Sequence, residues 1–241
     1  METIKIIQIV SVLISLIAPT FFYVNIREGI KNSNFETKLK LKFNRLLFIG
    51  VSFWVLAVFL LTLNNFFSYN EGESFPKFLL GLLVPVSAVL ILFSNKNLRT
   101  ILNNISFRYL ALGQTWRVLG AIFFLVAISG IGPKEFIGSG IGDITTGAIA
   151  ILTVWSLSKG YGWSKISMFG LVAFGVVDLL IVLFILLTKY PIWSSAIPST
   201  ASAGSFPMML IIGIAAPMAL LLHVFMLRKL ILEKKPKLIS N

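Results

Sequence analysis

Four ionisable residues lie inside segments that otherwise consist of apolar residues: Arg117, Asp143, Asp178 and His223. An ionisable group at the centre of a bilayer costs on the order of 3 kcal/mol on insertion scales, so such groups face a cavity or pair with one another. An imidazole titrates near neutral pH, and an acid inside a membrane must be protonated, paired or hydrated. These four residues mark where we expect the function of this chain to lie.

Their spacing predicts how they meet. Arg117 and Asp178 fall at nearly the same depth in their segments, so we expect a buried ion pair between them, one that on its own would specify only the fold. Gln114 lies three residues before Arg117 and projects from a similar side of a helix. Asp143 falls about 10 Å below the outer end of its segment at a rise of roughly 1.5 Å per residue.

His223 falls near the inner end of the last segment. Ordered from outside to inside, the expected series is therefore Asp143, then Asp178 with Arg117, then Gln114 and His223. If the helices pack around one cavity, this series forms a polar route across most of the membrane. Such a route suits a proton-coupled transporter, or the passage of a small polar solute.

Six glycines on the same segments predict close contacts between helices, because glycine lets a neighbouring backbone approach. They are Gly113, Gly120, Gly140, Gly142, Gly147 and Gly175. The glycine-rich run 138–147 superficially resembles a nucleotide-binding loop, but no strand precedes it and no G-K-[ST] follows. We expect this run to begin a tightly packed helix that is locally unwound.

Metal ions and cofactors are not expected. His223 is the only histidine and the chain has no cysteine, and one imidazole cannot build a zinc or copper site alone. A haem held by His223 and Met226 is the remaining alternative. A proton relay or a hydrogen bond inside a cavity fits His223 more easily.

The composition places these residues in a membrane. Hydrophobic residues make up 57% of the 241 residues, charged residues only 12%, and the mean hydropathy is +0.92. About 20 apolar residues cross a hydrocarbon layer roughly 30 Å thick, and we therefore predict an all-α fold, a single domain over residues 1–241 with seven transmembrane helices. The predicted spans are residues 4–25, 46–66, 78–94, 109–130, 136–157, 166–188 and 207–228.

The distribution of Lys and Arg predicts that the N-terminus is outside and the C-terminus inside, because cytoplasmic loops carry the excess. Sixteen of the 21 Lys and Arg residues lie in 26–45, 95–108, 158–165 and 228–241. The opposite side has Lys5, Lys77, Lys134 and Lys189. We expect a multi-pass protein of the cell membrane whose cytoplasmic face contacts anionic lipids. Nucleic-acid binding is not expected, since no basic patch is interleaved with stacking aromatics.

Other features predict local structure. Pro85 and Pro217 fall near the middle of spans and predict kinks. The tryptophans, Trp54 among them, predict anchoring at the membrane interface or packing. Residues 97–107 predict a segment along the inner surface, and 197–205 a flexible outer loop.

The polar pattern also carries a resemblance. The motifs are Gln114-x-x-Arg117-x-x-Gly120, Gly140-x-Gly142-Asp143-x-x-x-Gly147, Gly175-x-x-Asp178-Leu179, and Pro217 with His223. Together they resemble a group of small bacterial multispan membrane proteins of uncharacterised function, over spans four to seven. The resemblance implies no activity.

Familiar seven-span families do not match. A retinal protein needs a lysine in the middle of its last span, where this chain has Lys229 only at the inner end. The acidic-Arg-aromatic triplet of G-protein-coupled receptors is missing after span three. The repeated prolines of three-plus-one-plus-three sugar exporters are missing as well.

Three classes of function remain. A transporter or channel predicts that the polar residues line one cavity. An accessory subunit, bound to another membrane protein or to a second copy, predicts that they pair in a dry interior. A membrane-embedded enzyme is the weakest, because the acids and the histidine lie on different helices without a second catalytic cluster.

Overall fold

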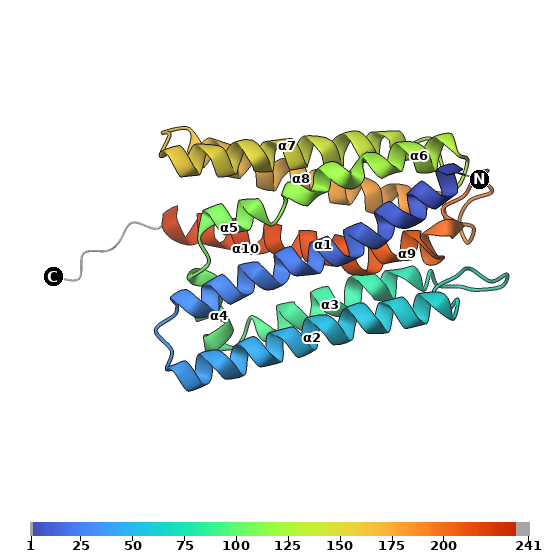
Figure 1. The fold of residues 1–241 in the computed structure, drawn as a ribbon. Coiled ribbons are helices and arrows are strands. Elements are labelled where there is room, and N and C mark those ends of the chain that lie inside the picture. The colour runs from blue at the N-terminus through green and yellow to red at the C-terminus, as the bar shows by residue number, and fades with distance from the viewer. Residues whose placement is uncertain (1, 235–241) are drawn as a thin grey trace.

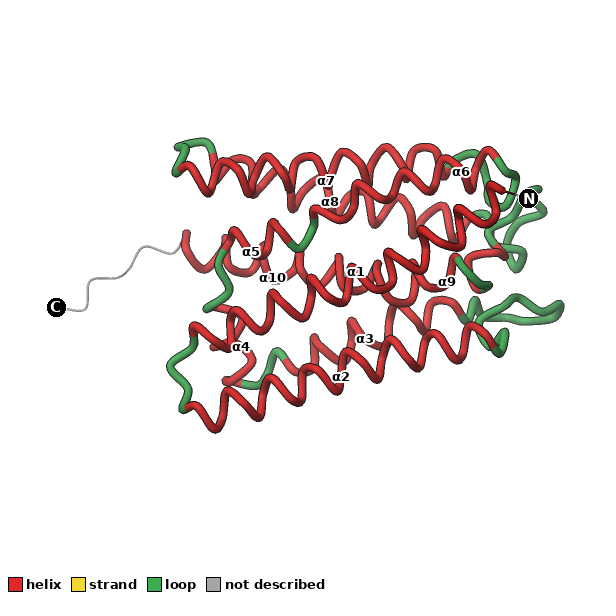
Figure 2. Tube along the Cα trace, viewed as in Figure 1, coloured by secondary structure: helices red, strands yellow, loops and turns green. Residues whose placement is uncertain are grey.

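The long helices of this chain run along one common axis, and most of the loops gather at the two ends of the bundle (Figures 1 and 2). The computed structural model describes residues 2–234, and this range contains no β-strand. α1 starts at one end and α10 finishes at the other (Figure 1). The elements are α1 (Glu2–Asn32), α2 (Thr37–Leu63), α3 (Phe78–Leu92), α4 (Lys96–Asn103), α5 (Phe107–Leu112), the 3₁₀ helix η1 (Thr115–Ala121), α6 (Ile122–Ile128), α7 (Phe136–Lys159), α8 (Ser164–Thr188), the 3₁₀ turn η2 (Ala201–Gly204), α9 (Met208–Leu210), the π-helix η3 (Ile211–Ala215) and α10 (Ala216–Lys234).

Six helical stretches are long and apolar enough to cross a membrane. The chain is therefore an integral membrane protein with several membrane-spanning helices. The predicted span at 78–94 is the exception, because α3 has only 15 residues and then bends by 101° into α4. At about 1.5 Å per residue it is shorter than a roughly 30 Å hydrocarbon layer. A seventh span requires that the bent pair α3–α4 be counted as one.

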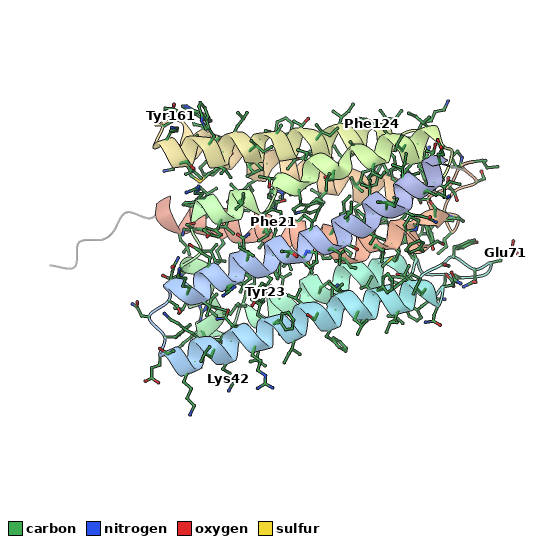
Figure 3. All side chains as sticks on the ribbon, in the orientation of Figure 1. Phe21, Tyr23, Lys42, Glu71, Phe124 and Tyr161 are labelled. Carbon is green, nitrogen blue, oxygen red and sulfur yellow. The ribbon has the colours of Figure 1, made fainter. Side chains whose placement is uncertain are left out.

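The loops that carry most of the basic residues lie at one end of the bundle. Figure 3 places Lys42 and Tyr161 at this end and Glu71 at the opposite one. The connection from α1 to α2, the helix α4 and the connection from α7 to α8 all lie there (Figure 1). Lys235 and Lys237, which the sequence assigns to the same end, lie outside the described residues.

The segment predicted along the inner surface forms the short helix α4. The side chain of Asn95 caps it, since Oδ1 accepts a hydrogen bond of 2.8 Å from the backbone N–H of Asn97. Ile101 and Leu102 are buried against the bundle, while Arg99 is exposed. One apolar and one basic face suit a helix that lies at a membrane surface.

The loop predicted to be flexible at 197–205 is packed into the bundle at Thr200, Ala203 and Gly204, whereas Ile197 is 97% exposed. Thr200 is fully buried, and its hydroxyl donates a 2.7 Å hydrogen bond to the carbonyl of Leu186. The hydroxyl of Ser202 donates to the carbonyl of Ile131 at 2.9 Å. Serine and threonine gave a loop signal, but here they bond to the ends of α8 and to the loop after α6, which removes their freedom.

An ion pair joins the residue before α7 to the residue after α8, at the end of the bundle opposite the basic loops. The ammonium of Lys189 lies 2.9 Å from Glu135 Oε1. The hydrogen bond from Lys189 holds the pKa of Glu135 below its usual value. The carboxyl is half exposed, so the pair adds little to stability.

Pro217 interrupts the last span. Proline has no N–H, so the carbonyl of Gly213, four residues earlier, loses the donor that an α-helix would supply. Just before the proline the backbone widens into the π-helix η3, where the N–H of Ala216 donates to the carbonyl of Ile211. The kink expected at this proline is therefore a change of helix type.

Trp54 of α2 supplies the missing donor. Its indole Nε1–H donates a 2.9 Å hydrogen bond to the carbonyl of Gly213. Only Val58 and Thr62 of α2 are fully buried, although further side chains along one face, Trp54 among them, pack against the core. This bond therefore attaches a peripheral helix to the centre of the bundle.

Replacing Trp54 by Phe tests this attachment. The substitution keeps an aromatic ring but leaves the carbonyl of Gly213 without its donor, so we expect the free energy of unfolding to fall by about 0.5–2 kcal/mol. Thermal unfolding of the purified protein in detergent measures it. The matched control is Trp193→Phe, at a side chain that is 56% exposed. Equal effects of the two substitutions would contradict the assigned role of Trp54.

Candidate functional site

The predicted span at 109–130 is discontinuous, and Arg117 lies on its irregular part. α5 ends at Leu112, and the 3₁₀ helix η1 follows before α6 (Figure 2). Residues three apart lie one turn apart in a 3₁₀ helix, so Gln114 and Arg117 share a side as expected. Gly113 and Gly120 flank this stretch, and glycine is a poor helix former.

The local unwinding expected at 138–147 is wrong, because α7 is continuous from Phe136 to Lys159. In this helix Gly140, Gly142 and Gly147 face packed neighbours, and the helix remains regular. The irregular backbone lies instead on the neighbouring helix, which packs directly against α7 through η1.

The Arg117 guanidinium holds two carboxylates. Arg117 is only 1% exposed, so it does not extend to the headgroups. Its Nε donates a 2.6 Å hydrogen bond to Asp143 Oδ1 on α7, and its Nη2 donates to Asp178 Oδ2 on α8. The ion pair with Asp178 that the sequence predicted is present, and Asp143 completes it to a triad.

His223 of α10 contacts the same guanidinium. Its Nε2 lies 3.2 Å from Arg117 Nη1, and the same Nη1 donates to the carbonyl of Gly175 at 3.3 Å. A guanidinium only donates, so His223 Nε2 must accept, which puts the imidazole proton on Nδ1. Nδ1 is buried and has no hydrogen-bond partner among the described residues.

The structure therefore replaces the expected polar route with a compact cluster, which we call the Arg117 cluster: Arg117, Asp143, Asp178 and His223. The predicted order by depth placed each residue only by its position along a straight helix. The long arginine side chain reaches all three partners from one position, so residues on α7, α8 and α10 converge on it.

Gln114 lies apart from this cluster. Its Nε2 donates a 2.9 Å hydrogen bond to the carbonyl of Ala219, and its Oε1 is buried without a partner among the described residues. Sequence reasoning missed Asn25 of α1, which is fully buried and lies against Gly113. Asn25 is the last residue of the predicted span 4–25, and an amide at a span end gave no signal that it is buried.

Three glycines leave the space that the cluster occupies. A Cβ added at Gly120 would overlap the carboxyl group of Asp143, and one at Gly142 would overlap that of Asp178. A Cβ added at Gly175 would overlap the imidazole of His223. Each titratable side chain thus lies directly over the backbone of a neighbouring helix.

The other predicted packing glycines also lie at close contacts. A Cβ at Gly147 would lie 2.6 Å from the backbone nitrogen of Val118, and one at Gly113 would lie 2.7 Å from Asn25 Nδ2. A Cβ at Gly140 would meet the ring of Phe124 at 3.2 Å. These contacts bring α7 against η1 and α6, and α1 against the end of α5.

Among residues 2–234, no three His, Cys, Asp or Glu side chains are grouped so that they could hold a metal ion. The Nε2 of His223 and one oxygen of each aspartate already contact Arg117. A metal or a haem at His223 Nε2 would have to displace the guanidinium.

Paired glycine substitutions test the close contacts. Gly142→Ala forces Asp178 to move, so we expect it to destabilise the protein by about 1–3 kcal/mol. Gly138→Ala on the same helix meets nothing within 4 Å, so its effect should be neutral or stabilising by up to about 1 kcal/mol. The pair Gly175→Ala and Gly170→Ala repeats the comparison on α8. Unfolding in detergent measures all four, and equal stabilities within either pair would refute the predicted crowding.

Removal of the guanidinium tests the charge pairing. Arg117→Met leaves the buried carboxylate of Asp178 and the partly buried one of Asp143 without a partner, so we expect a loss of about 3–5 kcal/mol in the free energy of unfolding. Adding Asp143→Asn and Asp178→Asn to this variant should restore part of the loss. Arg99→Met, at an exposed arginine of α4, is the control. A triple variant no more stable than Arg117→Met would contradict the pairing.

The comparisons with known proteins give a family and no activity. No curated protein and no solved structure matches the chain. Residues 75–231, from just before α3 into α10, match a family model described as a domain of unknown function (DUF8737), and this range contains every member of the Arg117 cluster. The chain belongs to the DUF8737 family.

Proposed function

We propose that this protein is a proton-coupled transporter or channel for a small polar solute, and that the Arg117 cluster is its proton-binding site. We further propose that it crosses a bacterial cell membrane seven times, with the N-terminus outside and the C-terminus inside. The observation that carries the proposal is the pairing of the buried Asp178 and the partly buried Asp143 with a single guanidinium.

Charge balance is the physical argument. With both aspartates ionised, the guanidinium compensates one carboxylate and leaves one negative charge in a low-dielectric interior. His223 accepts a hydrogen bond from Arg117 and adds no positive charge. An uncompensated charge in such a place is costly, and one proton on Asp143 or Asp178 neutralises the cluster. The cluster thus has a reason to take up one proton that a simple Arg–Asp pair would lack.

Irregular helices beside the cluster support movement. η1 carries Arg117, and the π-helix η3 precedes the helix that carries His223. Discontinuous helices at membrane depth are common where transporters bind substrates and coupling ions. Changes in these segments would alter which groups the guanidinium holds.

Topology follows from the basic end of the bundle. The positive-inside rule orients this end toward the cytoplasm. The exposed basic residues of α2 and α4 then face anionic headgroups, which attract juxtamembrane Lys and Arg.

Reconstitution tests the transport proposal. In liposomes that contain a pH-sensitive dye and carry a pH gradient, we expect at least one small amino acid, sugar or amine to move protons faster with the protein than without it. Asp178→Asn should abolish the difference, because the cluster is then neutral without a bound proton. Glu135→Gln, at a half-exposed acid outside the cluster, should keep it. Flux equal to that of empty vesicles for every solute would overturn the proposal.

A second candidate is an accessory subunit. The pairing of the polar residues in the Arg117 cluster is what we expected of this class, and the exposure of α2 favours it as well. Only Val58 and Thr62 of this helix are buried. Such a helix has a surface free for another membrane protein or a second copy of the chain. Under this alternative the Arg117 cluster would specify the fold alone, and the reconstituted protein would move no solute.

A further inference from the structure

A cavity of about 100 Å³ adjoins the Arg117 cluster. It lies between α1, α3, η1, α8 and α10, and its walls are almost entirely apolar. Arg117 and Asp143 are its only charged lining residues, whereas Asp178 and His223 lie outside it. Its volume is somewhat below the roughly 150 Å³ of an engineered apolar cavity that binds benzene. An occupant would therefore be small, with an apolar body and at most one polar group.

Asp143 is the member of the cluster that an occupant would meet. Its side chain is 14% exposed, against 5% for Asp178 and 1% for Arg117. Oδ1 of Asp143 accepts the hydrogen bond from Arg117. Oδ2 lies over Gly120, another lining residue, and accepts no hydrogen bond from any described residue. One carboxylate oxygen therefore stays available beside an apolar space.

The cavity also reaches the membrane side of the bundle. Leu180 of α8 lines the cavity and is 59% exposed. In a chain whose α8 is apolar enough to span a membrane, this surface faces lipid. A molecule dissolved in the bilayer would thus approach from the side.

We infer that this cavity binds a small hydrophobic amine in its protonated form, with the apolar body between α3 and α8 and the ammonium on Asp143 Oδ2. The inference rests on the proposed function, because it uses the same uncompensated negative charge. An ammonium neutralises the cluster as a proton does, so the two compete, and binding of the amine releases the proton. A neutral molecule leaves the charge uncompensated, and an anion increases it.

Cyclopentylammonium and cyclopentanol test this inference as a charged and a neutral probe of similar shape. Titration calorimetry of the full chain in detergent should show the amine binding at least about tenfold more tightly than the alcohol, as expected for a charge-assisted hydrogen bond. Asp143→Asn should remove this preference and leave alcohol binding unchanged. Ala216→Leu, which fills the cavity from α10, should weaken the binding of both probes. Ala148→Leu, on the exposed face of α7, should change neither.

Two results would overturn the inference: equal affinity for amine and alcohol, or amine binding that Ala216→Leu leaves unchanged. The second does not depend on how the Asp143 variant folds. Proton release, followed with a pH indicator in weakly buffered solution, separates this site from the proposed function. An amine that binds with the expected preference but releases no proton supports the site and contradicts proton coupling. If a solute drives proton flux in liposomes but no amine binds, the result supports proton coupling and contradicts the amine site.

Discussion

The rest of the structure depends on one guanidinium that is held on all sides by groups from other helices. Arg117 has five N–H donors, and the atoms that carry them contact Asp143 on α7, Asp178 and the Gly175 carbonyl on α8, and His223 on α10. Lipid tails are as apolar as leucine, so burial of apolar side chains gives little drive for helices to associate inside a membrane. Directed polar contacts supply the specificity that is otherwise missing. A glycine lies beneath each of the three partner side chains, because these side chains can reach Arg117 only where the neighbouring helix has no Cβ.

The irregular backbone of this protein follows from the same constraint. Backbone that departs from the α-helix is tolerated at membrane depth only where protein or water satisfies its polar groups. All five residues of η3 are buried, and η1 buries Trp116, Arg117 and Gly120. The carbonyl that Pro217 leaves without a helical donor is satisfied by Trp54 from α2. A single residue, Pro217, therefore accounts for the change of helix type and for the contact that attaches α2.

The sequence predicted the all-helical class and the Arg117–Asp178 pair because both follow from quantities that a linear chain carries: hydropathy over about 20 residues and depth along a helix. It did not predict which span is irregular. Glycine is compatible with both a regular and an unwound helix, and the tertiary contacts of η1 and α7 decide between them. Nor did it predict that His223 meets Arg117, because depth along straight helices ignores the reach of a long side chain. The packed loop at 197–205 was missed for a similar reason, since the partners of Thr200 and Ser202 are distant in sequence.

The division of the chain between family-matched and unmatched parts separates charge from shape. Residues 75–231 match the family and contain every charged group of the site. The cavity beside Asp143 is not completed by that range, because Ile14 of α1 lines it as well. α1 also contributes the buried Asn25, which lies against Gly113 near the start of η1. The charge that attracts a cation and most of the cavity wall are therefore properties of the matched range, and α1 completes that wall through Ile14. Changes in α1 would alter which molecules fit without altering the charge that holds them.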